Sequence, residues 1–319
     1  MIANIRRWMG ALLSVPLLAA MTAGCGTDAS SFQASDKGGT ESAVVITDFA
    51  DREVTLHDLP KRIVALGNGE VDIVYALGGT LVGRPEDNAG LITEGVKDVP
   101  VVGSAHTVNL EEIAVVQPDV VLGNNPMNLN DIPLLEGIGS KVVLTEANSI
   151  DDIRRQIELF GKLLNKEDKA SELIKEIDTE LAQWKNKTQS QRRALIVYGA
   201  PGTFLAALPQ SLAGNVLETA GGANIAAEYA RLQNYPNYAQ LNTERVVESG
   251  PDVIFIMTHG NKEDVEKSFL HEMEGNPAWQ TVPAVRDGRI HVLPPELFGM
   301  NPGTRIAEAV HLLGELLHS

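Results

Sequence analysis

The sequence predicts an α/β protein in which two similar lobes are joined by one long helix. Short β-branched runs alternate with helical stretches from Ala43 onward, which is typical of βα units with parallel strands. A long amphipathic segment at 151–187 divides these runs into two sets, and a motif of the first set recurs in the second. We therefore expect a first lobe at 43–150, a linking helix at 151–187 and a second lobe at 188–319.

Seven short apolar runs are the predicted strands. Several are continuously apolar, as expected of strands that are covered on both faces. The runs are 63–66, 101–102, 120–122, 142–144, 194–198, 253–257 and 290–293.

The predicted linking helix shows a clear helical period. Apolar residues recur every three or four positions from Ile153 to Trp184, with charged residues between them. The pattern indicates one long helix, and Asn165 is the candidate position for a break.

The repeated motif supports two similar lobes. Asn109 begins an Asn-x-Glu segment that ends in Pro118-Asp119 and a β-branched run, and the same pattern starts at Asn242, an offset of 133 residues (242 minus 109). Each copy is expected to form a short helix, a Pro-Asp turn that ends it, and a buried strand.

Composition excludes several classes of protein. Hydrophobic residues make up 44% and charged residues 21% of the 319, which is ordinary for a globular chain. Lys and Arg total 26 against 42 Asp and Glu, for a net charge of -16, and no basic run is longer than a pair, so nucleic-acid binding is excluded. A single cysteine excludes an intramolecular disulfide and any cysteine-cluster metal site.

That cysteine ends an export signal. Residues 1–25 contain Arg6-Arg7, an uncharged stretch and then small residues before Cys25, the order of a secretory signal peptide. The segment resembles a bacterial lipoprotein signal, which implies a lipid such as palmitate on Cys25 and a protein anchored on the extracytoplasmic face of the cell membrane. The alternative is an ordinary cleaved signal. Residues 26–42 are rich in Gly, Ser and Thr and predict a flexible tether.

Several segments together resemble a known family. They are 60–66 (PKRIVAL), 75–78 (YALG), 99–103 (VPVVG), 221–225 (GGANI) and the two copies of the repeated motif. In this order they are similar to the helical-backbone periplasmic binding proteins, the substrate-binding lipoproteins of ABC importers for iron complexes (siderophores, haem) and cobalamin. The resemblance implies two Rossmann-like lobes bridged by a single long α-helix, a ligand cleft between them, and delivery of the ligand to a permease with its ATPase. It implies a monomer without enzymatic activity and without a cofactor of its own.

The resemblance also implies one glutamate on each lobe that contacts the permease. In the first lobe the position falls on Glu94, with Glu86 as a nearby rival. In the second lobe Ala223 replaces the usual glutamate, and Glu228 is the candidate substitute.

Ligand-binding residues are expected in the loops that follow the strands, because ligands of open α/β sheets bind beyond the carboxyl ends of the strands. The candidates are Arg84, His106, Met127, Tyr198, Tyr235, His259, Met300 and Arg305.

The sequence leaves three classes of ligand open: ferric siderophores, haem and cobalamin. A ferric siderophore already fills the coordination sphere of its iron, so cations such as Arg84 and Arg305 would bind an anionic chelate. Haem needs an axial ligand, and only for haem would His259 and Met127 act as metal ligands. We expect a ferric siderophore first, haem second and cobalamin third.

Other functions fit the sequence less well. Gly67-Asn68-Gly69 lacks the third glycine of a dinucleotide-binding loop, because Asp72 stands in its place. No G-x-S-x-G elbow of a serine hydrolase occurs. Only His106 and His259 fall in cleft loops, too few for a free zinc or manganese site. An adhesion or signalling module that kept the fold without transport is the remaining alternative.

Overall fold

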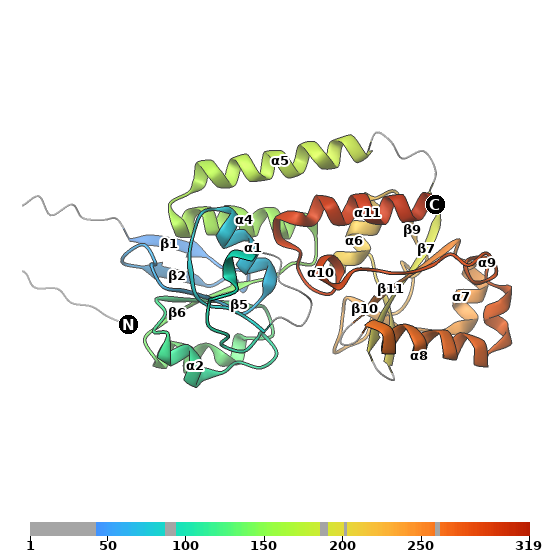
Figure 1. The fold of residues 1–319 in the computed structure, drawn as a ribbon, viewed down its shortest axis with the longest axis horizontal. Helices are drawn as coiled ribbons and strands as arrows, with labels where there is room; N and C mark the ends of the chain where they lie inside the picture. Colours follow the sequence, from blue (N-terminus) through green and yellow to red (C-terminus); the bar gives the residue numbers. More distant parts are fainter. Residues whose placement is uncertain (1–42, 87–93, 186–190, 201–202, 259–261) are drawn as a thin grey trace, which may run out of the picture. The chain divides into compact units, whose positions relative to one another are not determined.

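The computed structural model describes residues 43–86, 94–185, 191–200, 203–258 and 262–319 (Figure 1). The predicted signal peptide with Cys25 and the predicted tether lie outside the described residues. Residues Glu41–Ser319 form one compact unit. No helix in the described part of the chain is long and apolar enough to cross a membrane.

The first sheet is parallel and has the strand order β4-β3-β5-β6. Its strands are mostly buried, which explains their continuous apolar sequence. They are β3 (Ile63–Ala65), β4 (Leu81–Gly83), β5 (Val120–Asn124) and β6 (Lys141–Thr145). The helices and 3-10 turns of this part are α1 (Asn68–Ala76), η1 (Glu94–Val96), α2 (Leu110–Val115), η2 (Leu129–Asp131) and α3 (Ile132–Gly137). An antiparallel pair, β1 (Val44–Thr47) and β2 (Glu53–Leu56), precedes them.

The second sheet is mixed, with the order β10-β8-β7-β11-β12 and with β9 beside β7. The pairs β7–β11 and β11–β12 are parallel, whereas β8 pairs antiparallel with both β7 and β10. Its strands are β7 (Arg193–Ala200), β8 (Thr203–Ala207), β9 (Ala223–Asn224), β10 (Tyr238–Gln240), β11 (Val253–Thr258) and β12 (Ile290–Val292). Its helices and turns are α6 (Leu212–Thr219), α7 (Thr243–Ser249), α8 (Lys262–Gly275), η3 (Pro277–Thr281), α9 (Pro283–Arg286), α10 (Pro295–Phe298), η4 (Gly303–Arg305) and α11 (Ile306–His318).

The repeated motif has the same structural role in both sheets. Asn109 caps α2 and Asn242 caps α7, each through a side-chain oxygen that accepts a backbone N–H three residues on. The aspartate of each Pro-Asp pair then accepts a backbone N–H at the start of the neighbouring strand: Asp119 from Arg62 and Asp252 from Arg193. The motif therefore fixes a helix, a strand and the strand beside it.

The segment predicted as one linking helix is two helices, α4 (Ile150–Leu164) and α5 (Glu167–Lys185). Asn165 adopts the left-handed conformation (φ 53°) and ends α4, a conformation that asparagine tolerates better than most residues. The two helices pack against each other, with Gly161 facing Ala170. The prediction of a single helix is thus corrected at the position where the sequence offered a break.

The C-terminal segment returns to the first sheet. After α10, the turn η4 packs on α1, and α11 then packs on α5 and α6 (Figure 1). Asp72 of α1 accepts hydrogen bonds from the backbone N–H and the hydroxyl of Thr304. The division at residue 188 made from the sequence does not anticipate this contact.

Six predicted strands exist and one does not. Residues 101–102 form no strand, because Val101 makes only an isolated bridge with Arg84. Within the described residues, six strands were not predicted, among them β8, which is partly exposed over its first three residues, and β10, which is only three residues long.

Candidate functional site

A pocket of about 510 Å³ lies where the carboxyl ends of β3, β5 and β6 meet the loop before β10 and the segment after α10. Its volume is in the range of small-molecule sites. Its lining comprises Gly67, Asn68, Gly69, Glu70, Ala105, His106, Asn124, Asn125, Pro126, Met127, Glu146, Ala147, Asn148, Asn234, Tyr235, Pro236, Asn237, Tyr238, Met300 and Asn301.

Glu70, in the first turn of α1, is a buried carboxyl group of the pocket. Its Oε1 lies 2.5 Å from the hydroxyl oxygen of Thr145, which is also 3.1 Å from the carbonyl oxygen of Gly123. Thr145 has one hydroxyl proton for these two acceptors, so a protonated Glu70 that donates to Thr145 satisfies both contacts. Burial raises the pKa of Glu70 above its ordinary value, which favours the same protonated form.

Glycine at position 67 leaves room for this carboxyl group in the observed conformation. A Cβ atom at Gly67 would lie 2.2 Å from Oε2 of Glu70, so any other residue would push the carboxyl group away. The short Gly-Asn-Gly segment after β3 therefore makes room for a buried acid rather than for a phosphate.

Glu146, which follows β6, carries the second carboxyl group of the pocket. Its Oε2 accepts a hydrogen bond of 3.0 Å from the side-chain amide of Asn125, and its Oε1 accepts one from Asn148. The side-chain oxygen of Asn148 in turn accepts a 2.7 Å bond from Asn237, which belongs to the loop before β10. This polar chain runs from the first sheet to a loop of the second.

Buried Gln156 of α4 holds the two sides of the pocket together. Its amide donates to the backbone oxygen of Glu146 (2.7 Å), and its side-chain oxygen accepts from Asn301 (3.0 Å). Asn301 packs so closely on Gly69 that a Cβ there would lie 2.3 Å from it. Met300 is thereby held beside the pocket on a well-fixed segment.

Two tyrosines form the wall contributed by the second sheet. Tyr238 of β10 lies against Tyr198 of β7, with ring centroids 5.2 Å apart, and burial raises the pKa of Tyr238 to about 12. Tyr235, in the preceding loop, is 61% exposed and is accessible to a ligand.

The structure brings four of the predicted ligand-binding residues together. His106, Met127, Tyr235 and Met300 line the pocket, and Tyr198 adjoins it through Tyr238. His259 lies outside the described residues.

Both predicted arginines are placed elsewhere. The guanidinium of Arg84 donates to the backbone oxygens of Pro85 and Lys97, and that of Arg305 forms a two-point ion pair with Glu308. Neither lines the pocket. Each arginine is therefore bonded to protein groups near it in the sequence.

The sequence-based candidates include neither of the two carboxyl groups and none of the seven asparagines of the lining. Glu70 lies in the segment that follows the strand predicted at 63–66, where ligand contacts were expected, but it was not among the candidate residues. Glu146 and Asn148 directly follow a predicted strand, so the rule on strand ends would have found them had it been applied to the run at 142–144.

Two of the three glutamates predicted to contact the permease have described side chains, and both lie on the surface. Glu86 and Glu228 are exposed, the latter in the turn that follows β9. Glu94 begins η1, and its side chain lies outside the described part.

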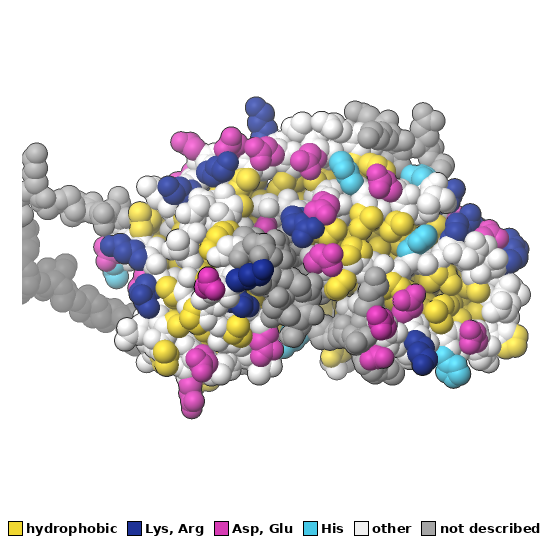
Figure 2. Space-filling view, viewed as in Figure 1, with side chains coloured by type: hydrophobic (Ala, Val, Ile, Leu, Met, Phe, Trp, Pro, Cys, Tyr) yellow, Lys and Arg dark blue, Asp and Glu magenta, His cyan; other side chains and the backbone are white. Residues whose placement is uncertain are grey.

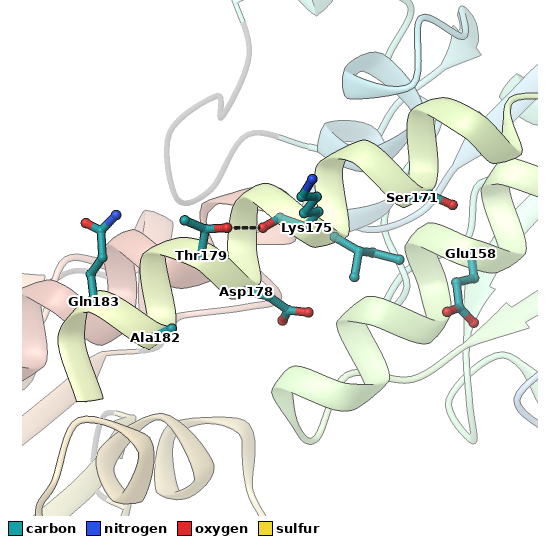
Figure 3. A pocket seen from close by; sticks show the side chains of 8 residues that line it. Glu158, Ser171, Lys175, Asp178, Thr179, Ala182 and Gln183 are labelled. Carbon is teal, nitrogen blue, oxygen red and sulfur yellow. Dashed lines mark hydrogen bonds between the residues drawn. The ribbon is translucent and has the colours of Figure 1, made fainter. Parts of the chain in front are cut away.

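A second, more open hollow of about 610 Å³ lies between α4 and α5, away from the strand ends. Figure 3 shows the side chains that line it, Glu158 from α4 and a row from α5 that includes Lys175, Asp178 and Thr179. The Thr179 hydroxyl donates to the backbone oxygen of Lys175, 2.7 Å away. The hollow follows from the packing of two helices and contains none of the predicted ligand-binding residues.

Comparison with known proteins decides the family. A model of the periplasmic binding protein family matches residues 63–297, most of the chain. The chain is a periplasmic binding protein. The match confirms the family to which the sequence segments pointed.

Relatives and solved structures agree with this assignment. The high-affinity heme uptake system protein IsdE of Staphylococcus aureus is 27% identical over 241 residues, covering 75% of this binding protein and 80% of IsdE. The structure of S. aureus IsdE complexed with heme matches with a TM-score of 0.71 and 25% identity, over 81% of this chain and 99% of that one. An ABC transporter substrate-binding protein from Listeria monocytogenes EGD-e matches with a TM-score of 0.71 and 27% identity, over 82% and 99%. These structures confirm the predicted α/β fold class.

The surface of this binding protein is acidic but mixed. On the face shown in Figure 2, acidic side chains are interspersed with Lys and Arg, which occur singly or in small groups. In the described part of the chain, no group of three or more His, Cys, Asp and Glu side chains could hold a metal ion.

Proposed function

We propose that this protein is the extracytoplasmic receptor of an ABC importer, that it captures an iron complex in the pocket beside β3, β5 and β6, and that it delivers the complex to the permease. One observation carries the proposal: in a periplasmic binding protein, a pocket of ligand size is lined by elements of both sheets. The receptor makes and breaks no bond of its cargo and uses no resident cofactor.

A ferric siderophore is the first candidate ligand. The iron of such a complex needs no protein ligand, so the protein contributes hydrogen bonds. Seven asparagines line the pocket, and the asparagine amide carries both hydrogen-bond donors and an acceptor.

Haem is the second candidate, supported by a specific observation. His106, Met127, Tyr235 and Met300 all line the pocket and carry atoms that can act as axial ligands of haem iron. Relatedness to IsdE, named as a heme uptake protein, supports the same ligand.

The binding experiment compares these ligands directly. The purified protein is titrated with ferric haem by absorbance, and with ferric siderophores and cobalamin by equilibrium dialysis. Saturable binding of one complex near one equivalent is the expected result. Failure of all of them to bind at concentrations typical of receptor ligands would contradict the proposed function.

Variants of histidine distinguish the two candidates. His106→Ala is expected to alter the absorbance of bound haem if His106 is an axial ligand, whereas binding of a ferric siderophore would change little. His271→Ala is the matched control, because His271 is an exposed histidine of α8 outside the pocket.

We further propose that Cys25 carries a lipid anchor and that a monomer presents Glu86 or Glu94, together with Glu228, to the permease. Cys25→Ser should release the protein from the membrane fraction without changing ligand affinity. Charge reversal at Glu228 should lower uptake by cells while binding by the purified receptor stays unchanged. Retention of Cys25→Ser at the membrane would contradict the anchor.

A further inference from the structure

The pocket has an unusual charge for a site that was expected to bind anionic chelates. Among its described lining residues are two carboxyl groups, Glu70 and Glu146, and neither Lys nor Arg. The only other titratable side chains in that lining are His106 and two tyrosines. The described lining therefore presents no Lys or Arg to an anionic ligand, and the chain as a whole carries a net charge of -16.

Glu146 carries the negative charge of the pocket. Each of its carboxylate oxygens already accepts one amide hydrogen bond, from Asn125 and from Asn148. A carboxylate has roughly four lone-pair positions, so it retains capacity for a donor on a ligand. Glu146 is half-buried, which strengthens an added charge-assisted bond relative to one in water.

Glu70 differs from Glu146 in its surroundings. It is buried, and its partner Thr145 has only one proton to share with two acceptors. The neutral form satisfies this arrangement, and the Glu70 carboxyl group is bonded to a protein partner inside the fold. The two acids of the pocket therefore have separate roles.

We propose that Glu146 recognises a protonated amine on the cargo, so that the pocket selects cationic ferric chelates over neutral and anionic ones. This inference rests on the proposed function and names the charge class of its ligand. The Asn148–Asn237 bond of 2.7 Å positions the recognising group at the junction between the first sheet and the loop before β10. An amine bound to Glu146 would thus lie beside residues of both sheets.

A matched pair of ligands tests the inference without any mutation. Ferrioxamine B is a ferric trihydroxamate with one pendant ammonium group, and its N-acetyl derivative has the same iron coordination but no charge. The full-length protein in mild detergent should bind ferrioxamine B about tenfold or more tightly, the ratio expected of one charge-assisted hydrogen bond. Raising the salt concentration should reduce the ratio.

Variants assign the preference to Glu146. Glu146→Gln should bring the two affinities within about threefold of each other by weakening ferrioxamine B alone, because one charge-assisted bond is then lost. Glu158→Gln, the same change at an exposed glutamate of α4 outside the pocket, should leave the ratio unchanged. If Glu146→Gln does not fold, as judged by circular dichroism, the ratio of the wild-type affinities for ferrioxamine B and its N-acetyl derivative tests the charge preference.

Two further ligands separate this inference from the proposed function. Equal or weaker binding of ferrioxamine B relative to its acetylated form, or tighter binding of haem or trianionic ferric enterobactin, would overturn the charge preference and leave the receptor function intact. An unchanged ratio in a folded Glu146→Gln would also overturn it. Failure to bind every iron complex would contradict the proposed function itself, and the inference with it.

Discussion

The Asp72 carboxylate joins α1 to the C-terminal part of the chain through Thr304. Its Oδ2 accepts a hydrogen bond of 2.6 Å from the backbone nitrogen and one of 2.7 Å from the hydroxyl of Thr304. Asp72 is 7% exposed, and Gly303 approaches it so closely that a Cβ there would lie 2.3 Å from Oδ2. The turn before α11 is therefore built around this one side chain.

Asp72→Ala is expected to destabilise the protein by about 2 kcal/mol or more, because two partly buried donors of Thr304 lose their acceptor. Asp72→Asn keeps an acceptor oxygen and should cost clearly less. Denaturant unfolding measures both. Asp58→Ala, at an exposed aspartate, is the control, and an equal loss in all three variants would contradict the assigned role.

The pocket acid Glu70 should make stability depend on pH. Burial raises the pKa of Glu70 in the folded state above the ordinary 4.5. At a pH between 4.5 and this folded-state pKa, the folded protein holds a proton that the unfolded chain has lost. The stabilisation from Glu70 is thus complete below about pH 4.5 and disappears as pH rises through the folded-state pKa. Glu70→Gln mimics the protonated acid. Its free energy of unfolding relative to that of the wild type should therefore rise by up to about 1.4 kcal/mol per pH unit across that interval.

The measurement is urea unfolding of wild type and Glu70→Gln from pH 4 to pH 8. Glu158→Gln serves as the control. Its free energy of unfolding should depend on pH in the same way as that of the wild type, because the Glu158 side chain is exposed. A constant difference between wild type and Glu70→Gln at every pH would show that Glu70 titrates normally.

The sequence predicted those parts of the fold that depend on local patterns. The copies of the motif that begin at Asn109 and Asn242 carry their own caps and turns, so their structure follows from residues a few positions apart. The break at Asn165 was visible, but its consequence, two packed helices, depends on Gly161 meeting Ala170 across the turn. A 3.6-residue period of apolar residues predicts that a segment is helical, but it does not tell which element packs on that helix.

The candidate site was predicted by location rather than by chemistry. The rule on strand ends found the loops of His106 and Met127, and both line the pocket. The two arginines were chosen for their charge, yet Arg305 is paired with Glu308 one helical turn away. The bond between Glu70 and Thr145 joins residues 75 positions apart, and no spacing in the sequence reveals it.

The half-buried Tyr238 of the pocket wall should lose its proton only at high pH, because its pKa is raised. Burial and the neighbouring Tyr198 raise the pKa of Tyr238 to about 12. The ultraviolet absorbance of tyrosinate, measured against pH for wild type and for Tyr238→Phe, should differ by one transition near that value. Tyr235→Phe, which removes an exposed tyrosine, is the control and should leave the transition of Tyr238 in place. A Tyr238 transition near pH 10 would mean that the ring is solvated.

The crossing of α4 and α5 should tolerate no side chain at Gly161. A Cβ at this position would lie 2.6 Å from the Cβ of Ala170, closer than two carbon atoms can approach, and neither atom can rotate away. Gly161→Ala should therefore destabilise the protein by about 1–3 kcal/mol despite the higher helix propensity of alanine. Adding Ala170→Gly should restore part of the loss, because it removes the atom with which the new methyl group collides. A double-mutant cycle by denaturant unfolding measures this coupling, and strict additivity would show that the helices separate freely at this point.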